Sequence, residues 1–232
     1  QSDVALRPVG KASYHSFQLK ATKRFSQGLS GLFFFTWAKS ITNASGGSTT
    51  YANFAEGSRQ YPGENPTSID PGVPAAIFGL NFSYDLPFGR GKHFLRSSSR
   101  LVDGVLGGWT LTGFMRYTSG SALQIWAINP FASILGYSSF IPMVNANYTG
   151  APVYKKKDFS SWNPYSDVYL NPEAFASPGL FAFGNTARYL DWARGPWMKS
   201  ESLSLLKAVD INERVKFRLG ADFINPFNIV RW

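Results

Sequence analysis

The sequence predicts an all-β protein, and three observations support this fold class. Glycine and proline are frequent, with 22 and 14 residues spread through the chain, which leaves little room for long helices. Apolar and polar residues alternate over several segments of roughly ten residues, as in strands that have one apolar and one polar face. Apolar runs such as Leu32–Phe35 are far shorter than the ~18 residues that a transmembrane helix needs.

The alternation predicts seven strands. It is clearest in the last one, where Phe217, Leu219 and Phe223 alternate with polar or small residues. It is weaker in the second, where Leu32 and Phe34 interrupt the polar face. The seven predicted strands are 16–25, 29–41, 77–86, 109–118, 121–128, 199–209 and 214–225.

The composition favours a membrane-facing sheet over a half-buried strand layer in a soluble sandwich. Charged residues make up 16% of the chain, against about 25% in soluble domains. Aromatic residues also make up 16%, and several lie near predicted strand ends, where barrels carry aromatic girdles. These residues are Phe25, Trp37, Tyr84, Phe88, Trp109, Tyr117 and Trp126.

The connections between strands alternate in length. Turns at 26–28 and 210–213 are short, whereas 42–75 and 129–197 are too long for loops of a compact soluble domain. Short periplasmic turns and long extracellular loops are typical of an antiparallel transmembrane β-barrel. The basic stretch 89–108 belongs on the short-turn side, where we expect it to rest on the periplasmic rim or to form a short helix around Arg100–Leu106.

The sequence predicts no catalytic, metal or cofactor site. Cysteine is absent, and the two histidines, His15 and His93, have no nearby carboxylate. The carboxylates of the long loop (Asp158, Asp167, Glu173 and Asp191) are best explained as solvated side chains rather than as a glycosidase pair. The net charge of +9 and the run Lys155–Lys157 indicate contact with lipopolysaccharide phosphates rather than with nucleic acid.

Aromatic residues crowd the last part of the long loop. Exposed aromatic rings can stack on sugars or hold an apolar ligand, although such rings also pack a loop against itself. Our candidates for substrate binding in this segment are Trp162, Tyr165, Tyr169, Tyr189 and Trp192.

Several stretches resemble one known family, in the order in which the family has them. They are FQLKATKRFSQGL at 17–29, FTWAKSI at 35–41, YDLPFGRGK at 84–92, LGGW at 106–109, TSG at 118–120, LSLLK at 203–207, NERV at 212–215 and ADFINPFN at 221–228. Together they span most of the chain and resemble the C-terminal part of the barrel of Oar-like TonB-dependent transporters.

The resemblance implies that residues 1–232 are a C-terminal portion of a larger barrel, whose plug and N-terminal domains lie outside this chain. Barrels of this type have about 22 strands, so seven would leave open edges in lipid. The implied function is passage of an unknown bulky solute across the outer membrane of a diderm bacterium, energised by a TonB–ExbB–ExbD complex through the plug. Two alternatives stay open: a structural or adhesive surface protein anchored by the barrel, and a soluble carbohydrate-binding β-sandwich.

Overall fold

The computed structural model describes residues 11–43, 67–131, 143–159, 161–210 and 215–230, and they form two units. We call the first the sheet unit; it comprises Phe17–Trp37, Ala76–Thr118 and Trp197–Trp232. The second is the loop unit, which comprises Gln1–Ser16, Ala38–Ala75 and Ser119–Pro196. None of the helices in the described ranges is long and apolar enough to cross a membrane.

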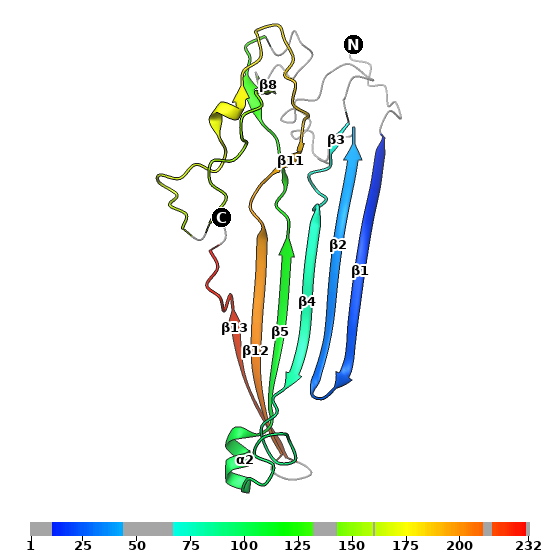
Figure 1. Ribbon diagram of the computed structural model, residues 1–232, viewed down its shortest axis with the longest axis vertical. Helices are drawn as coiled ribbons and strands as arrows, with labels where there is room; N and C mark the ends of the chain where they lie inside the picture. Colours follow the sequence, from blue (N-terminus) through cyan, green and yellow to red (C-terminus); the bar gives the residue numbers. More distant parts are fainter. Residues whose placement is uncertain (1–10, 44–66, 132–142, 160, 211–214, 231–232) are drawn as a thin grey trace, which may run out of the picture. The chain divides into compact units, whose positions relative to one another are not determined.

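The main sheet has the strand order β1-β2-β4-β5-β12-β13, and the short strand β3 (Ser68–Ile69) pairs with the end of β2. Figure 1 shows the long strands side by side. Antiparallel ladders join β2 to β4, β4 to β5, β5 to β12 and β12 to β13. The long strands are β1 (Ala12–Ser26), β2 (Leu29–Thr42), β4 (Ala76–Asp85), β5 (Trp109–Thr118), β12 (Met198–Asp210) and β13 (Lys216–Ile224).

A two-residue turn joins β1 to β2. Gln27 and Gly28 both have positive φ angles, 53° and 81°. Positive φ at both central residues is the geometry of a type I′ turn, whose twist matches that of the flanking strands. The short turn predicted at 26–28 is therefore confirmed. The one predicted at 210–213 lies, apart from Asp210, outside the described residues.

The ladders sort the side chains of β2, β4, β5, β12 and β13 onto two faces, because side chains on a strand alternate and directly paired residues share a face. Along one row of partners, Phe33 pairs with Leu80, Leu80 with Met115, and Met115 with Glu201. We call the first face the apolar face. It carries Leu29, Phe33, Phe35, Trp37, Phe78, Leu80, Phe82, Tyr84, Trp109, Leu111, Met115, Tyr117, Leu203, Leu205, Phe217, Leu219 and Phe223.

The opposite face, the polar face, carries mainly hydroxyl, amide and charged groups. Its residues include Ser30, Thr36, Asn81, Ser83, Asp85, Thr110, Thr112, Arg116, Thr118, Ser200, Ser202, Ser204, Lys216, Arg218 and Asp222. The predicted alternation of 77–86, 109–118 and 214–225 is confirmed in this sorting. An all-β fold with an antiparallel sheet of one apolar and one polar face is thus what the sequence forms.

Several residues break the two-face pattern, among them Leu32, Phe34, Phe114 and Leu206, which are apolar residues on the polar face. The ring of Phe34, an apolar residue on the polar face, lies directly over Gly79, where a Cβ atom would come within 2.1 Å of the Phe34 Cζ atom. Within the paired rows of these five strands, three charged residues occupy the apolar face, all on β12. Lys199 and Glu201 lie in its first four residues and Lys207 in its last four, so Leu203 and Leu205 between them keep the centre apolar.

Tyr84, Trp109 and Tyr117 on the apolar face lie at or next to strand ends, as predicted, whereas Trp37 lies inside β2 as its last residue that pairs with β4. Phe78 connects two of its neighbours: its ring meets Phe33 edge-on at 5.2 Å and stacks on Tyr117 at 5.6 Å between centroids. Such contacts add to the stability that pairing of the strands provides.

The connections at the two ends of the sheet differ in length. At one end, the short-turn end, the connections are the turn at 27–28, residues 86–108 and residues 211–215. At the other, the long-loop end, they are residues 43–75 and 119–197. The helix α2 spans Arg100–Leu106 within the 86–108 connection. Its predicted bounds are thus confirmed, and Ser99 caps its first turn by accepting a hydrogen bond from the Val102 amide.

The predicted strand 121–128 is wrong as a strand of the main sheet. This segment forms two short strands, β6 (Ala122–Leu123) and β7 (Trp126–Ile128), which pair with β11 (Leu190–Arg194) and β8 (Met143–Asn145) in the loop unit. The main sheet thus has six long strands among the described residues instead of seven. The physical reason is that alternation of apolar and polar residues indicates a strand with one covered face. It does not indicate which other strand that strand pairs with.

A charged side chain should distinguish the two faces in a bilayer. Leu80 and Asn81 are neighbours near the centre of β4, on the apolar and polar faces respectively. We expect Leu80→Arg to lower the free energy of unfolding by about 2–4 kcal/mol, the cost of an arginine that faces lipid near the midplane. The matched variant Asn81→Arg should change it by less than about 1 kcal/mol. Urea unfolding of the full-length protein in phospholipid bilayers measures both, and equal losses would contradict the assignment of faces.

Candidate functional site

The predicted binding residues lie in the part of the loop unit between β8 and β12. A short strand pair forms there from β9 (Asn147–Tyr148) and β10 (Phe175–Ala176), after the 3-10 helix η1 (Pro172–Ala174). Between these strands the chain folds back on itself. The amide of Lys155 donates to the carbonyl of Tyr169 at 3.0 Å, and that of Asn171 donates to the carbonyl of Val153 at 2.8 Å. Residues 153–171 therefore form a closed excursion, which we call the 153–171 loop.

Aromatic rings fill this loop. Tyr154 meets Tyr169 edge-on at 5.1 Å, Phe159 lies 5.4 Å from Tyr169, and Trp162 lies 5.0 Å from Phe159, all between ring centroids. We call these four residues the tyrosine cluster. Each is part-exposed, so the cluster supports the loop and also presents ring surface to solvent.

Two tyrosine hydroxyls fasten the loop to the end of β11. The Tyr169 hydroxyl donates to the carbonyl oxygen of Arg194 at 2.6 Å. The Tyr154 hydroxyl donates to the same oxygen at 3.2 Å and accepts from the Arg194 amide at 2.8 Å. Burial, together with the neighbouring Tyr154, raises the pKa of Tyr169 to about 12, so its hydroxyl remains a donor at physiological pH. Tyr169 is therefore an anchor as well as a predicted binding residue.

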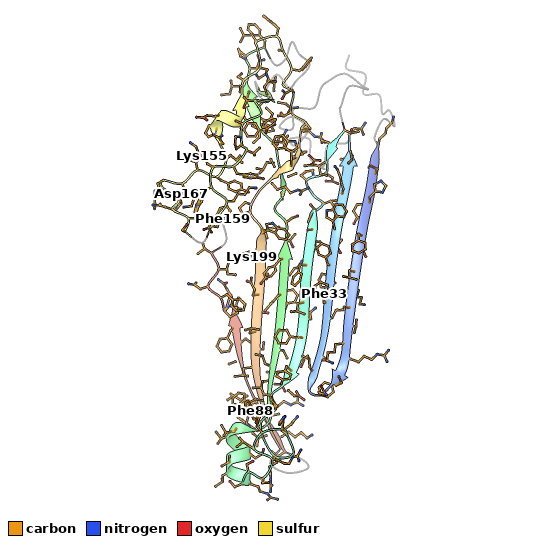
Figure 2. The ribbon with its side chains drawn as sticks, viewed as in Figure 1. Phe33, Phe88, Lys155, Phe159, Asp167 and Lys199 are labelled. Carbon is orange, nitrogen blue, oxygen red and sulfur yellow. The ribbon has the colours of Figure 1, made fainter. Side chains whose placement is uncertain are left out.

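Charged residues close the outer turn of the loop. Lys156 donates to the Asp167 carboxylate at 2.5 Å and to the carbonyl of Ser161 at 2.7 Å. The Asp167 carboxylate also accepts from the Asn163 amide at 2.7 Å. The hydrogen bond from Lys156, followed by that from Asn163, holds the pKa of Asp167 below its ordinary value. Figure 2 shows Lys155, Phe159 and Asp167 in the 153–171 loop.

The three consecutive lysines thus have different surroundings. Lys156 is in the ion pair, and the Lys157 ammonium lies 4.0 Å from the centroid of the Tyr154 ring. Lys155 is exposed. The prediction that this run contacts lipopolysaccharide phosphates stays a prediction, and Lys155 and Lys157, both exposed, are the residues available for it.

A second group of rings forms around the β9–β10 pair. Trp192 on β11 lies 4.8 Å from Tyr148 and is nearly parallel to Phe175 at 6.4 Å. We call Tyr148, Phe175 and Trp192 the tryptophan cluster. Asn185 braces it by exchanging hydrogen bonds with the backbone of Tyr148 and with the Asn147 side chain. Trp192 is 44% exposed, so one part of its indole is free to contact a ligand.

The five predicted binding residues are therefore divided among different surroundings. Trp162 and Tyr169 belong to the tyrosine cluster and Trp192 to the tryptophan cluster. Tyr165 is 97% exposed, and Tyr189 lies 5.4 Å from the guanidinium of Arg188. Sequence reasoning missed the partner rings Tyr148, Tyr154, Phe159 and Phe175. Their signal was present, because Tyr154 and Phe159 come within ten residues before Trp162.

The acidic residues of the loop are dispersed. Asp191 forms an ion pair with Lys39 at 3.0 Å, whereas Asp167 pairs with Lys156. Glu173 lies in η1. Among the residues that the structure describes, no group of three or more histidine, cysteine or acidic side chains could hold a metal ion.

Comparison with protein families identifies the class of protein to which the sheet and its loops belong. The model of the outer membrane beta barrel domain matches residues 4–232, and the chain belongs to that family. The protein is therefore located in a bacterial outer membrane. Comparisons with curated proteins and with solved structures found no match. In such barrels the short turns are periplasmic, the long loops are extracellular, and the apolar face meets lipid.

Removal of one hydroxyl should loosen the 153–171 loop. We expect Tyr169→Phe to weaken the attachment to Arg194 by about 0.5–1.5 kcal/mol, the usual net contribution of one hydrogen bond. Hydrogen exchange at the Lys155 and Asn171 amides should then accelerate by roughly two- to tenfold. Tyr165→Phe is the matched control, because Tyr165 is almost fully exposed. An unchanged exchange rate in Tyr169→Phe would show that its hydroxyl does not anchor the loop.

Acid should open the outer turn of the same loop. A carboxyl group whose pKa is lowered by folding stabilises the fold above its ordinary pKa, and this stability is lost as the pH falls through the lowered value. Because the pKa of Asp167 is lowered, we expect pepsin cleavage within 156–167 to increase below about pH 4. Asp167→Asn, already lacking the charge, provides the reference at each pH. If the ratio of the two cleavage rates does not change with pH, the ion pair does not hold this turn.

Proposed function

We propose that this chain forms part of the barrel of a TonB-dependent transporter, which takes up a bulky solute across the outer membrane. The observation that carries the proposal is the ordered series of motifs resembling Oar-like transporters. Most of these motifs fall on structural elements of the sheet unit: the β1–β2 hairpin, the end of β4, the start of β5, and β12 with β13. Because the motifs follow successive strands of one sheet, they support a relation to these transporters over the whole sheet rather than at a single hairpin.

In this proposal the described sheet supplies barrel wall. Its polar face, rich in Ser and Thr, suits a lumen that holds water and a plug. The plug would lie outside this chain and would couple to an inner-membrane TonB–ExbB–ExbD complex. The outer partners are lipid and lipopolysaccharide. Transport then rests on binding and plug movement, with no catalysis and no cofactor in this segment.

The extracellular loops would capture the solute. The tyrosine cluster and the tryptophan cluster both present part-exposed rings, supported from behind by hydrogen bonds to backbone. Rings held in fixed orientations lose little entropy when a flat or apolar surface stacks on them. This arrangement supports sugars or apolar solutes as the substrate class, with Trp162 and Trp192 as the principal contact residues.

Uptake by cells with and without TonB tests the proposal. Full-length protein is expressed in both, and uptake of a panel of labelled oligosaccharides and peptides is measured. We expect uptake of at least one solute only in cells with TonB, and we expect Trp192→Ala to raise its half-saturating concentration by roughly 2- to 13-fold. Trp197→Ala is the control, because Trp197 belongs to the sheet unit and to neither cluster. Uptake that does not need TonB would refute energised transport, and a full-length chain without a plug would favour an adhesive surface protein.

A further inference from the structure

The 86–108 connection at the short-turn end is larger and more basic than a turn requires. It contains Arg90, Lys92, Arg96 and Arg100 against a single acidic residue, Asp103, which gives a net charge of +3 with His93 neutral. All four basic side chains are exposed. A connection that only reversed the chain would need a few residues. Its size and charge therefore indicate a role beyond reversing the chain.

The end of α2 is fixed on the apolar face of the sheet. The indole N–H of Trp109 donates to the carbonyl of Val105 at 2.9 Å, and the Lys207 ammonium donates to the carbonyl of Gly107. Trp109 and Lys207 are direct cross-strand partners on the apolar face. Because α2 ends on these two side chains, the helix lies on the side of the sheet that meets lipid.

The exposed side of α2 is apolar. Leu101 and Val105, one turn apart, are 85% and 66% exposed, and Val102 and Leu106 beside them are 40% and 47% exposed. Asp103, the acidic residue of the helix, points back to the connection and accepts a hydrogen bond from the Arg90 amide at 2.6 Å. The helix therefore presents a continuous apolar stripe with no acidic group on it.

Aromatic residues extend this apolar surface. The rings of Phe88 and Phe94 stack at 5.6 Å, and both side chains are exposed. Figure 2 labels Phe88 beside the helix. A short helix with an apolar stripe and neighbouring basic residues is the arrangement that binds in the plane of a membrane interface.

We propose that α2 lies in the periplasmic leaflet of the outer membrane, with its apolar stripe among the lipid chains and its arginines on the phosphates of anionic phospholipid. Two observations favour anionic phospholipid as the partner of this stripe. The helix continues the apolar face, which meets lipid in this family of barrels, and it does so at the level where the strands end. The exposed cations complement an anionic headgroup. The inference does not depend on transport.

A fluorescent label at position 101 tests the placement. The chain has no cysteine, so Leu101→Cys introduces the thiol to be labelled, and Tyr165→Cys on the extracellular loop is the control. The full-length proteins are placed in nanodiscs of phosphatidylcholine and phosphatidylglycerol with brominated acyl chains. We expect bromine to quench the label at position 101 and iodide in solution to quench the label at position 165. Iodide quenching of both labels alike would overturn the proposal, because it would show that the stripe faces water rather than lipid.

A charge variant tests the headgroup. With the label at position 101, brominated phosphatidylglycerol should quench more efficiently than the same fraction of brominated phosphatidylcholine. Arg96→Gln with Arg100→Gln should lower this preference by at least about fivefold, since each basic residue near an anionic surface contributes about that factor. Arg116→Gln, on the polar face, should leave it unchanged. A preference that is absent in the parent protein, or retained in the double variant, would refute recognition of anionic lipid.

Discussion

The pairing of backbone groups within the bilayer is the constraint on which this structure depends. Lipid offers no hydrogen-bonding partner, so each amide and carbonyl at membrane depth must pair with a neighbouring strand. The ladders of β2, β4, β5, β12 and β13 supply these partners over nine or ten consecutive residues per pair of strands. β1 and β13 stand at the two ends of the strand order, and a barrel of this family closes such edges.

The remaining features follow from fixing the strands in this way. Registered strands divide side chains between two faces, so Leu80 and Asn81 meet different surroundings although they are neighbours. Antiparallel order makes the long connections leave the sheet at one end, and their described residues form their own short strands and aromatic clusters. It places α2 at the other end, where Trp109 and Lys207 of the apolar face hold its last carbonyl groups.

The long strands could be predicted from the sequence because a period of two is imposed by the backbone itself. The helix Arg100–Leu106 was also predicted, and the structure adds Ser99 as its N-cap. The partners of a strand are less visible: residues 121–128 alternate, yet they pair within the loop unit. The candidate site was only partly predictable, because composition identifies aromatic residues without showing which ones meet. Tyr169 and Trp192 join different clusters, and the attachment of Tyr154 and Tyr169 to the Arg194 backbone depends on a contact between distant segments.

The most direct test of the account is a cysteine scan along β5 of the full-length protein in lipid bilayers. Residues 109–118 are replaced one at a time, labelled, and scored for quenching by brominated lipid and by iodide in solution. We expect a period of two, with lipid contact at Leu111, Gly113 and Met115 and aqueous access at Thr110, Thr112 and Arg116. A scan with no alternation, or with the opposite phase, would contradict the claim that these strands cross the membrane with their apolar face toward lipid.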